Sequence, residues 1–95
     1  MKVLKKDGTV QTCNLAKIKL SIACASDEAR QPLTLSDLEI LARDISKKMK
    51  SMGKDIIKTD DIHSIVYDTL MEGGFSKIAK HYKNYAKRLD RENAG

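Results

Sequence analysis

The chain has little cysteine and no long apolar run, and both absences exclude classes of protein. Cys13 and Cys24 are its only cysteines, and they match neither the pairing of a secreted disulfide scaffold nor the spacing of a zinc site. No apolar run approaches the roughly 18 residues that a membrane-spanning helix needs. The first residues also lack the apolar stretch of a signal peptide. We therefore expect reduced thiols and a soluble, cytoplasmic protein with no membrane partner.

The sequence also lacks the motifs of nucleotide hydrolysis and of common catalytic sites. It contains neither a Walker-type Gly-Lys-Ser/Thr loop nor a GxGxxG motif. His63 follows Asp60 and Asp61, but no second His or Cys stands at ligand spacing, so a helix cap and a contact residue are the better interpretation. Ser64 and His63 lie about 100° apart on a helix and cannot act together as nucleophile and base. We expect no metal site and no catalytic activity.

Positive charge is what the chain has in excess. The net charge is +5 and the pI about 9.3, which favours an anionic partner such as a nucleotide, a nucleic acid or an acidic surface. At 95 residues the chain is expected to form one domain, residues 1–95, with its core at about 2–91. Its basic side chains recur on the last predicted helix as Lys77, Lys80, Lys83 and Lys87. Such a stripe is usually a solvated face, and non-specific contact with nucleic acid is the alternative.

A β-hairpin is predicted at the start of the chain. Two runs able to form strands, residues 3–6 and 9–13, flank Asp7-Gly8, a pair suited to a two-residue type I′ turn. This turn would place Lys5 opposite Val10. Ile57 lies at the centre of a third β-prone run, residues 56–58, which could join the hairpin.

Four helices are predicted from apolar residues at spacings of three and four. The first runs from an Asn14 cap to about residue 25, and the second begins at Thr34 or Ser36 and stops at Gly53. The third runs from a capped start at residues 59–61 to the glycines at 73–74, and the fourth begins at residue 75 or 76. Tyr82 and Tyr85 are expected in the core rather than stacked on bases. The fold class is α+β, a four-helix bundle capped by a small sheet of two or three strands.

The hairpin and the first helix start together bring several anion-favouring groups close in sequence. Lys5 and Lys6 lie on the hairpin, while Asn14 and Lys17 stand where a helix begins and leaves N–H groups unpaired. This pattern indicates a phosphate pocket. The alternative is that the lysines protect an exposed edge strand from unwanted pairing.

Three motifs, taken in order, resemble the ATP-cone domain. They are VLKKDG at residues 3–8, NLAKI at 14–18 and KTDDIH at 58–63. That family comprises the nucleotide-sensing module of many ribonucleotide reductases and of the repressor of ribonucleotide reductase genes. The resemblance covers about residues 2–91 and implies a site for ATP or dATP between the sheet and the helix ends, with Mg²⁺ left open.

The resemblance also implies which residues contact the nucleotide. They come from the hairpin, two helix starts and the last helix: Val3, Lys5, Lys6, Gln11, Asn14, Lys17, Ile18, Thr59, His63 and Lys87. The lysines would meet phosphates, with Arg88 an alternative to Lys87. Val3, Ile18, Asn14 and Gln11 would surround the base. Thr59 and His63 would contact phosphate and sugar.

The implied function is an allosteric adenine-nucleotide sensor that does not hydrolyse its ligand and belongs to, or partners, a ribonucleotide reductase. Self-association is the other partner considered. Two different classes stay open. One is a small basic DNA-binding regulator, although two cysteines cannot build the zinc ribbon of the repressor relatives. The other is a degenerate cone that serves only as a subunit interface.

Overall fold

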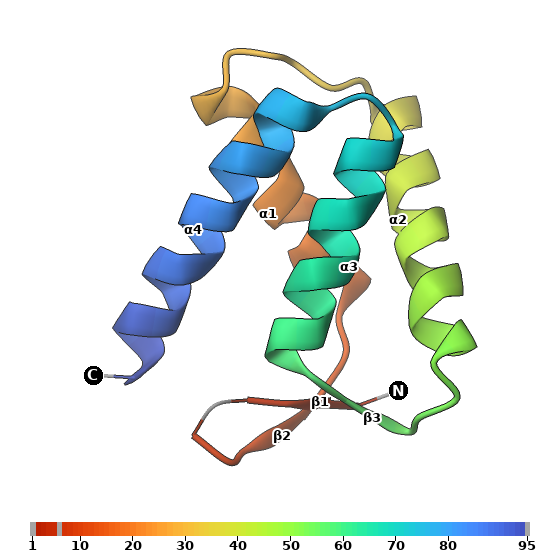
Figure 1. The fold of residues 1–95 in the computed structure, drawn as a ribbon, viewed down its shortest axis with the longest axis vertical. Coiled ribbons are helices and arrows are strands. Elements are labelled where there is room, and N and C mark those ends of the chain that lie inside the picture. The colour runs from red at the N-terminus through yellow and green to blue at the C-terminus, as the bar shows by residue number, and fades with distance from the viewer. Residues whose placement is uncertain (1, 6, 95) are drawn as a thin grey trace.

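The computed structural model describes the backbone of residues 2–5 and 7–94 and the side chains of residues 2–5 and 7–86. It confirms the predicted α+β class, with helices bundled above a small mixed sheet (Figure 1). The strands are β1 (Lys2–Leu4), β2 (Val10–Thr12) and β3 (Ile56–Lys58). The helices are α1 (Leu15–Glu28), α2 (Leu35–Ser51), α3 (Thr59–Glu72) and α4 (Ser76–Ala94).

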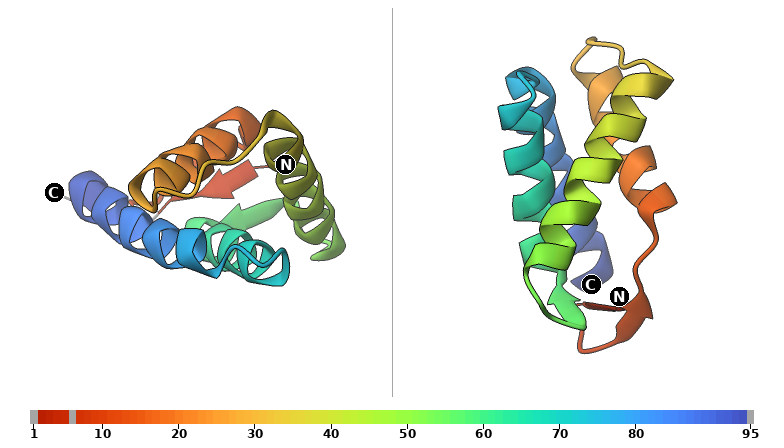
Figure 2. Two further views of the ribbon diagram at one scale, coloured as in Figure 1. Left: turned by 90° about the horizontal axis from the view of Figure 1, so that it is seen from above. Right: turned by 90° about the vertical axis from the view of Figure 1, so that its right-hand side faces the viewer.

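The helices form a closed ring, because α1 and α3 each pack against both α2 and α4. The sheet lies across one end of this ring, and the connections α1–α2 and α3–α4 lie at the other end (Figures 1 and 2). Seven side chains fill the centre and are fully buried: Ile22, Ile45, Met49, Ile57, Val66, Leu70 and Ile78. Each such side chain contributes about 1.5–3 kcal/mol of burial free energy. The buried core therefore stabilises the bundle that holds the sheet and the helix ends in place.

The third strand joins the sheet, as its β-prone sequence predicts. The strand order is β2-β1-β3, and β3 runs parallel to β1 with Ile57 opposite Val3. Ile57 is fully buried beneath the helices, while Ile56 and Lys58 on either side are exposed. One buried residue in a three-residue strand is enough to fix which face of the sheet meets the bundle.

The hairpin turn differs from the prediction by one residue. Leu4 pairs with Val10, and the Lys5 N–H donates to the Thr9 carbonyl at 2.8 Å, so Lys5 lies opposite Thr9. The predicted two-residue turn with Lys5 opposite Val10 is therefore wrong. The cause is Asp7, whose carboxylate accepts hydrogen bonds from the Thr9 N–H at 2.9 Å and the Thr9 hydroxyl at 2.6 Å. That local turn lengthens the loop to three residues, with Gly8 in the left-handed region at φ 89°.

The first helix is longer than predicted. It continues to Glu28 instead of ending near Ala25, because Ala29 is buried one turn after Ala25 and extends the apolar stripe. Ser26, just beyond the predicted end, is accommodated in the helix by donating its hydroxyl to the Ala23 carbonyl at 2.7 Å.

The second helix settles the choice between two predicted caps. Thr34 is the N-cap, and it forms a reciprocal capping box with Asp37, with hydrogen bonds of 3.1 and 3.2 Å. Ser36 therefore lies within the first turn. Glu39 lies three residues after Ser36, where a capping-box partner of Ser36 would stand, but it instead forms an ion pair with Lys19 of α1 at 2.6 Å. The predicted stop is confirmed, because Gly53 follows the helix at φ 66°.

Candidate nucleotide-binding site

A cavity of about 200 Å³ lies where α1 and α3 begin beside the sheet. Its wall comes from the hairpin and the two helix starts: Val3, Lys5, Gln11, Thr12, Cys13, Asn14, Lys17, Ile18, Thr59, Ile62 and His63. Eight of the sequence-predicted site residues are in this wall: Val3, Lys5, Gln11, Asn14, Lys17, Ile18, Thr59 and His63. The structure thus brings together residues that are up to 60 positions apart, Val3 and His63.

The hairpin presents one of its faces to the cavity. Val3 and Lys5 are two residues apart on one strand run, as are Gln11 and Cys13 on the other, so each pair shares a face. Val3 lies directly opposite Gln11, and directly opposite residues share a face as well. The observed register is therefore what gathers these four side chains, because a shift by one residue would turn Gln11 away from Val3.

The start of α1 adds a polar cap and a cation. The Asn14 side-chain oxygen accepts the Ala16 N–H at 3.0 Å, which confirms the predicted N-cap. With the oxygen engaged, the Asn14 amide NH₂ is the group available to donate into the cavity. Lys17 and Ile18 follow three and four residues later and so lie above Asn14 on the same helix face.

The start of α3 supplies the opposite wall. Thr59, Ile62 and His63 stand at positions i, i+3 and i+4, which places them on one face of the helix. The Thr59 hydroxyl donates to the Leu4 carbonyl at 3.1 Å, and this bond ties α3 to β1. Thr59 is the first helical residue rather than the predicted cap, and the N-cap Lys58 makes no side-chain capping hydrogen bond. The Lys58 side chain therefore satisfies none of the first N–H groups of α3.

The electrostatics of the cavity favour an anion. Among the described residues that line it are Lys5 and Lys17 and no carboxylate. The positive ends of α1 and α3 both lie at this end of the bundle (Figure 1). A neighbouring cavity of about 220 Å³ shares Lys5 and Thr59 and is also lined by Leu4, Lys58 and Asp60. The two cavities adjoin at these shared residues, so together they offer a ligand more room than either alone.

Two predicted residues lie outside the described side chains, Lys6 of the hairpin loop and Lys87 of α4. The C-terminal half of α4 does run back toward the sheet (Figure 1). The prediction missed Thr12, Cys13 and Ile62. Alternation from Gln11 would have found Cys13, and the helical spacing from Thr59 would have found Ile62. Burial raises the pKa of the Cys13 thiol, which keeps this wall of the cavity uncharged.

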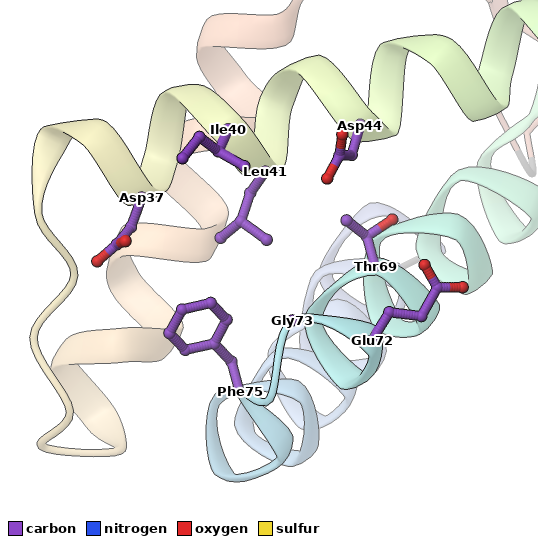
Figure 3. Close-up of a pocket in the computed structure, with 8 residues that line it drawn as sticks. All are labelled: Asp37, Ile40, Leu41, Asp44, Thr69, Glu72, Gly73 and Phe75. Atoms are coloured by element: carbon purple, nitrogen blue, oxygen red, sulfur yellow. The ribbon is translucent and has the colours of Figure 1, made fainter.

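A larger cavity, about 440 Å³, lies between α2 and the α3–α4 turn (Figure 3). Ile40, Leu41 and Phe75 are its large apolar lining residues, and Figure 3 shows the Phe75 ring below Leu41. Its rim carries Asp37, Asp44 and Glu72. Lys48 pairs with Glu72 at 2.7 Å, but the carboxylates of Asp37 and Asp44 would still repel a triphosphate. The smaller cavity beside the sheet therefore fits a nucleotide better despite its size.

The fold and the cavity define a small α+β domain that offers a cationic site between its sheet and its helix starts. A family model described as the ATP cone domain matches residues 1–91, and the chain therefore belongs to the ATP-cone family. Membership implies nucleotide-sensing regulation, with an adenine nucleotide as the allosteric ligand.

A curated relative is similar to most of this chain. It is "Transcriptional repressor NrdR 2" of Paramagnetospirillum magneticum, 28% identical over 91 residues. The matched region makes up 93% of this chain and 58% of the relative, so the chain spans little more than half of the relative's length. In the described part of this chain, no helix has the length and apolar character needed to cross a membrane.

Proposed function

We propose that this chain is an allosteric sensor that binds ATP or dATP in the cavity beside the sheet and releases it unhydrolysed. The single observation that carries the proposal is the gathering of two lysines, an asparagine cap and the start of α3 around one cavity. Family membership supports the adenine base.

Each group in the wall has a chemical counterpart on the ligand. Lys5, Lys17 and the first N–H groups of α3 suit phosphate oxygens, because cations and helix N-termini both stabilise anions. The Asn14 amide and Gln11 can donate to ring nitrogens and accept from the adenine amino group. Val3 and Ile18 are half-buried and offer an apolar surface to the base. His63 then lies at the sugar.

The regulatory output would be a change in packing or association. A ligand shifts an equilibrium only by its difference in affinity for two states, so ATP and dATP must differ in what they stabilise. We propose a ribonucleotide reductase catalytic subunit, or a second copy of this chain, as the partner that responds. A sensor of the nucleotide pool would work in the cytoplasm.

Mg²⁺ would arrive on the nucleotide. No group of three or more His, Cys, Asp or Glu that could hold a metal occurs among the described residues. Mg²⁺ usually keeps several waters and binds through substrate phosphates with one or two carboxylates. A bound Mg²⁺ would supply neutralisation of phosphate charge, and the lysines and amides of the cavity would make the remaining contacts with the nucleotide.

Calorimetric titration with ATP, dATP and GTP at fixed magnesium and salt tests the proposal. We expect saturable binding of the adenine nucleotides, weaker binding of GTP, and a loss of about tenfold or more in Lys5→Ala, because a hydrogen bond to a charged group is removed. His63→Ala should also weaken binding. Lys77→Ala is the matched control, since it removes an exposed lysine from α4 outside the cavity wall.

A DNA-binding regulator is the second candidate, favoured by the name of the curated relative and by the exposed residues Lys77, Lys80 and Lys83 on α4. The same titration with a short DNA duplex separates the two. Duplex binding that falls steeply with salt, without any response to ATP, would replace the sensor. A folded chain that responds to neither would be a subunit interface only.

A further inference from the structure

His63 is the one aromatic ring among the described residues that line the cavity. It is half-buried in the second turn of α3. An imidazole contacts a ligand through two ring nitrogens at fixed angles, so the orientation of the ring decides whether those nitrogens face the cavity. Whatever holds the ring therefore sets the geometry of this part of the site.

Tyr82 of α4 contacts His63 from the core side. The ring centroids are 6.1 Å apart, and the rings are inclined by 78°, an edge-to-face arrangement. Aromatic pairs prefer this geometry because the positive edge of one ring meets the negative face of the other. Tyr82 is the point at which α4 touches an aromatic side chain of the cavity wall.

Tyr82 is itself held firmly. It is only 4% exposed, and the residues one turn before and after it on α4, Ile78 and Ala86, are buried as well. A ring packed in such a core has few alternative rotamers. The fixed Tyr82 ring can therefore restrict the orientation of the more exposed His63 imidazole.

We propose that Tyr82 is a positioning residue of the nucleotide site, which holds the His63 imidazole toward the cavity and links occupancy of the cavity to α4. This inference rests on the proposed function, since it requires a nucleotide to bind beside His63. Tyr82 does not touch the ligand in this account and acts only through His63.

A double-mutant cycle on nucleotide affinity tests the inference. Tyr82→Leu should weaken ATP binding by about three- to tenfold, the range expected for loss of one aromatic pair. In a His63→Ala background the same substitution should cost nothing further, because its only route to the ligand is gone. Tyr82→Phe keeps the ring that meets His63 and should bind ATP more tightly than Tyr82→Leu does. Ile78→Ala, which truncates a buried side chain one turn before Tyr82, should leave affinity unchanged at a temperature where the variant is folded.

Nuclear magnetic resonance of the wild-type chain tests the contact without any variant. Nuclear Overhauser effects between the His63 and Tyr82 rings should appear in the free protein and persist with ATP bound. Their absence in both states would overturn the inference. So would an equal loss from Tyr82→Leu with and without His63, which would show a general effect of the core. If the wild-type chain binds no nucleotide at all, the proposed function fails first, and that result is distinct from either of these.

Discussion

At the scale of single residues, Cys13 is a thiol in the wall of the cavity, whereas Cys24 lies on α1 outside that wall. Burial raises the pKa of the Cys13 thiol above its ordinary value of 9.0, so little thiolate forms at neutral pH. Because a ligand in the cavity would cover Cys13 and not Cys24, the two cysteines report on occupancy.

We predict that iodoacetamide alkylates Cys13 slowly at pH 7.5 and progressively faster as the pH rises toward the raised pKa of the thiol. Saturating ATP should lower the rate at Cys13 several-fold and leave the rate at Cys24 unchanged. Peptide mass spectrometry of a time course measures both rates in one sample. Equal protection of both cysteines would indicate general stabilisation, and unchanged rates at both would contradict a ligand in this cavity.

Asp7 is a second residue whose ionisation matters. Hydrogen bonds from the Thr9 hydroxyl and the Thr9 N–H lower the pKa of its carboxyl below the ordinary 3.8. A depressed pKa means that the contribution of this turn to stability is complete above the unfolded-state pKa and is lost as the pH falls through the folded-state pKa.

We therefore predict that the stability difference between the wild type and Asp7→Asn is constant above about pH 5 and shrinks as the pH falls below about 4. Urea unfolding of both proteins at matched pH values measures the difference, and other carboxylates such as Glu39 cancel because both proteins contain them. If the stability difference between the two proteins grew toward low pH, its sign would contradict a lowered pKa of the Asp7 carboxyl.

At the scale of elements, the hairpin shows how far local sequence chemistry can lead. Asp7-Gly8 correctly predicts a turn, but the pair alone does not reveal that Asp7 hydrogen-bonds to Thr9 and lengthens the loop. With the predicted register, Gln11 and Val3 would lie on opposite faces. The family resemblance nevertheless implies one site for both residues, and only the observed register, with Val3 opposite Gln11, allows this.

Helix boundaries are predictable where a local side-chain hydrogen bond fixes them. They are less predictable where tertiary packing fixes them. Asn14 caps α1 as predicted, because its side chain bonds within its own turn. The end of α1 depends instead on whether the apolar stripe continues past Ser26 to Ala29, and only the burial of Ala29 in the bundle decides this. For α3, the Thr59 hydroxyl bonds to Leu4, 55 residues away, rather than capping the helix.

The capping box of α2 leads to a prediction with a matched control. Thr34→Ala removes the cap and should cost about 1 kcal/mol, which lowers Tm by about 4–8 °C in a domain of this size. Ser36→Ala, the alternative cap from the sequence, should change stability by less than about 0.5 kcal/mol. Thermal unfolding followed by circular dichroism measures both. A larger effect at Ser36 would mean that the helix begins two residues later than observed.

At the scale of the whole molecule, the chain has two sources of attraction for an anion. One is the overall charge of +5, which draws any anion from solution and is screened by salt. The other is local, since Lys5, Lys17 and two helix starts surround one cavity. The sequence revealed the first directly from composition. The second needed the fold, because only the sheet and the bundle bring residues 3–18 and 59–63 together.

The two sources can be separated by comparing lysines that contribute equally to the overall charge. Saturating ATP should raise Tm, since a ligand at 100 times its Kd stabilises the folded state by about 2.7 kcal/mol. Lys17→Ala and Lys77→Ala each lower the net charge by one, yet Lys17 lines the cavity and Lys77 does not. We predict that the ATP-induced rise in Tm falls sharply in Lys17→Ala and stays close to the wild-type value in Lys77→Ala. Raising the salt concentration should reduce the rise in all three proteins. If the ATP-induced rise in Tm falls equally in both variants, overall charge alone attracts the nucleotide, and the nucleotide does not bind in the cavity.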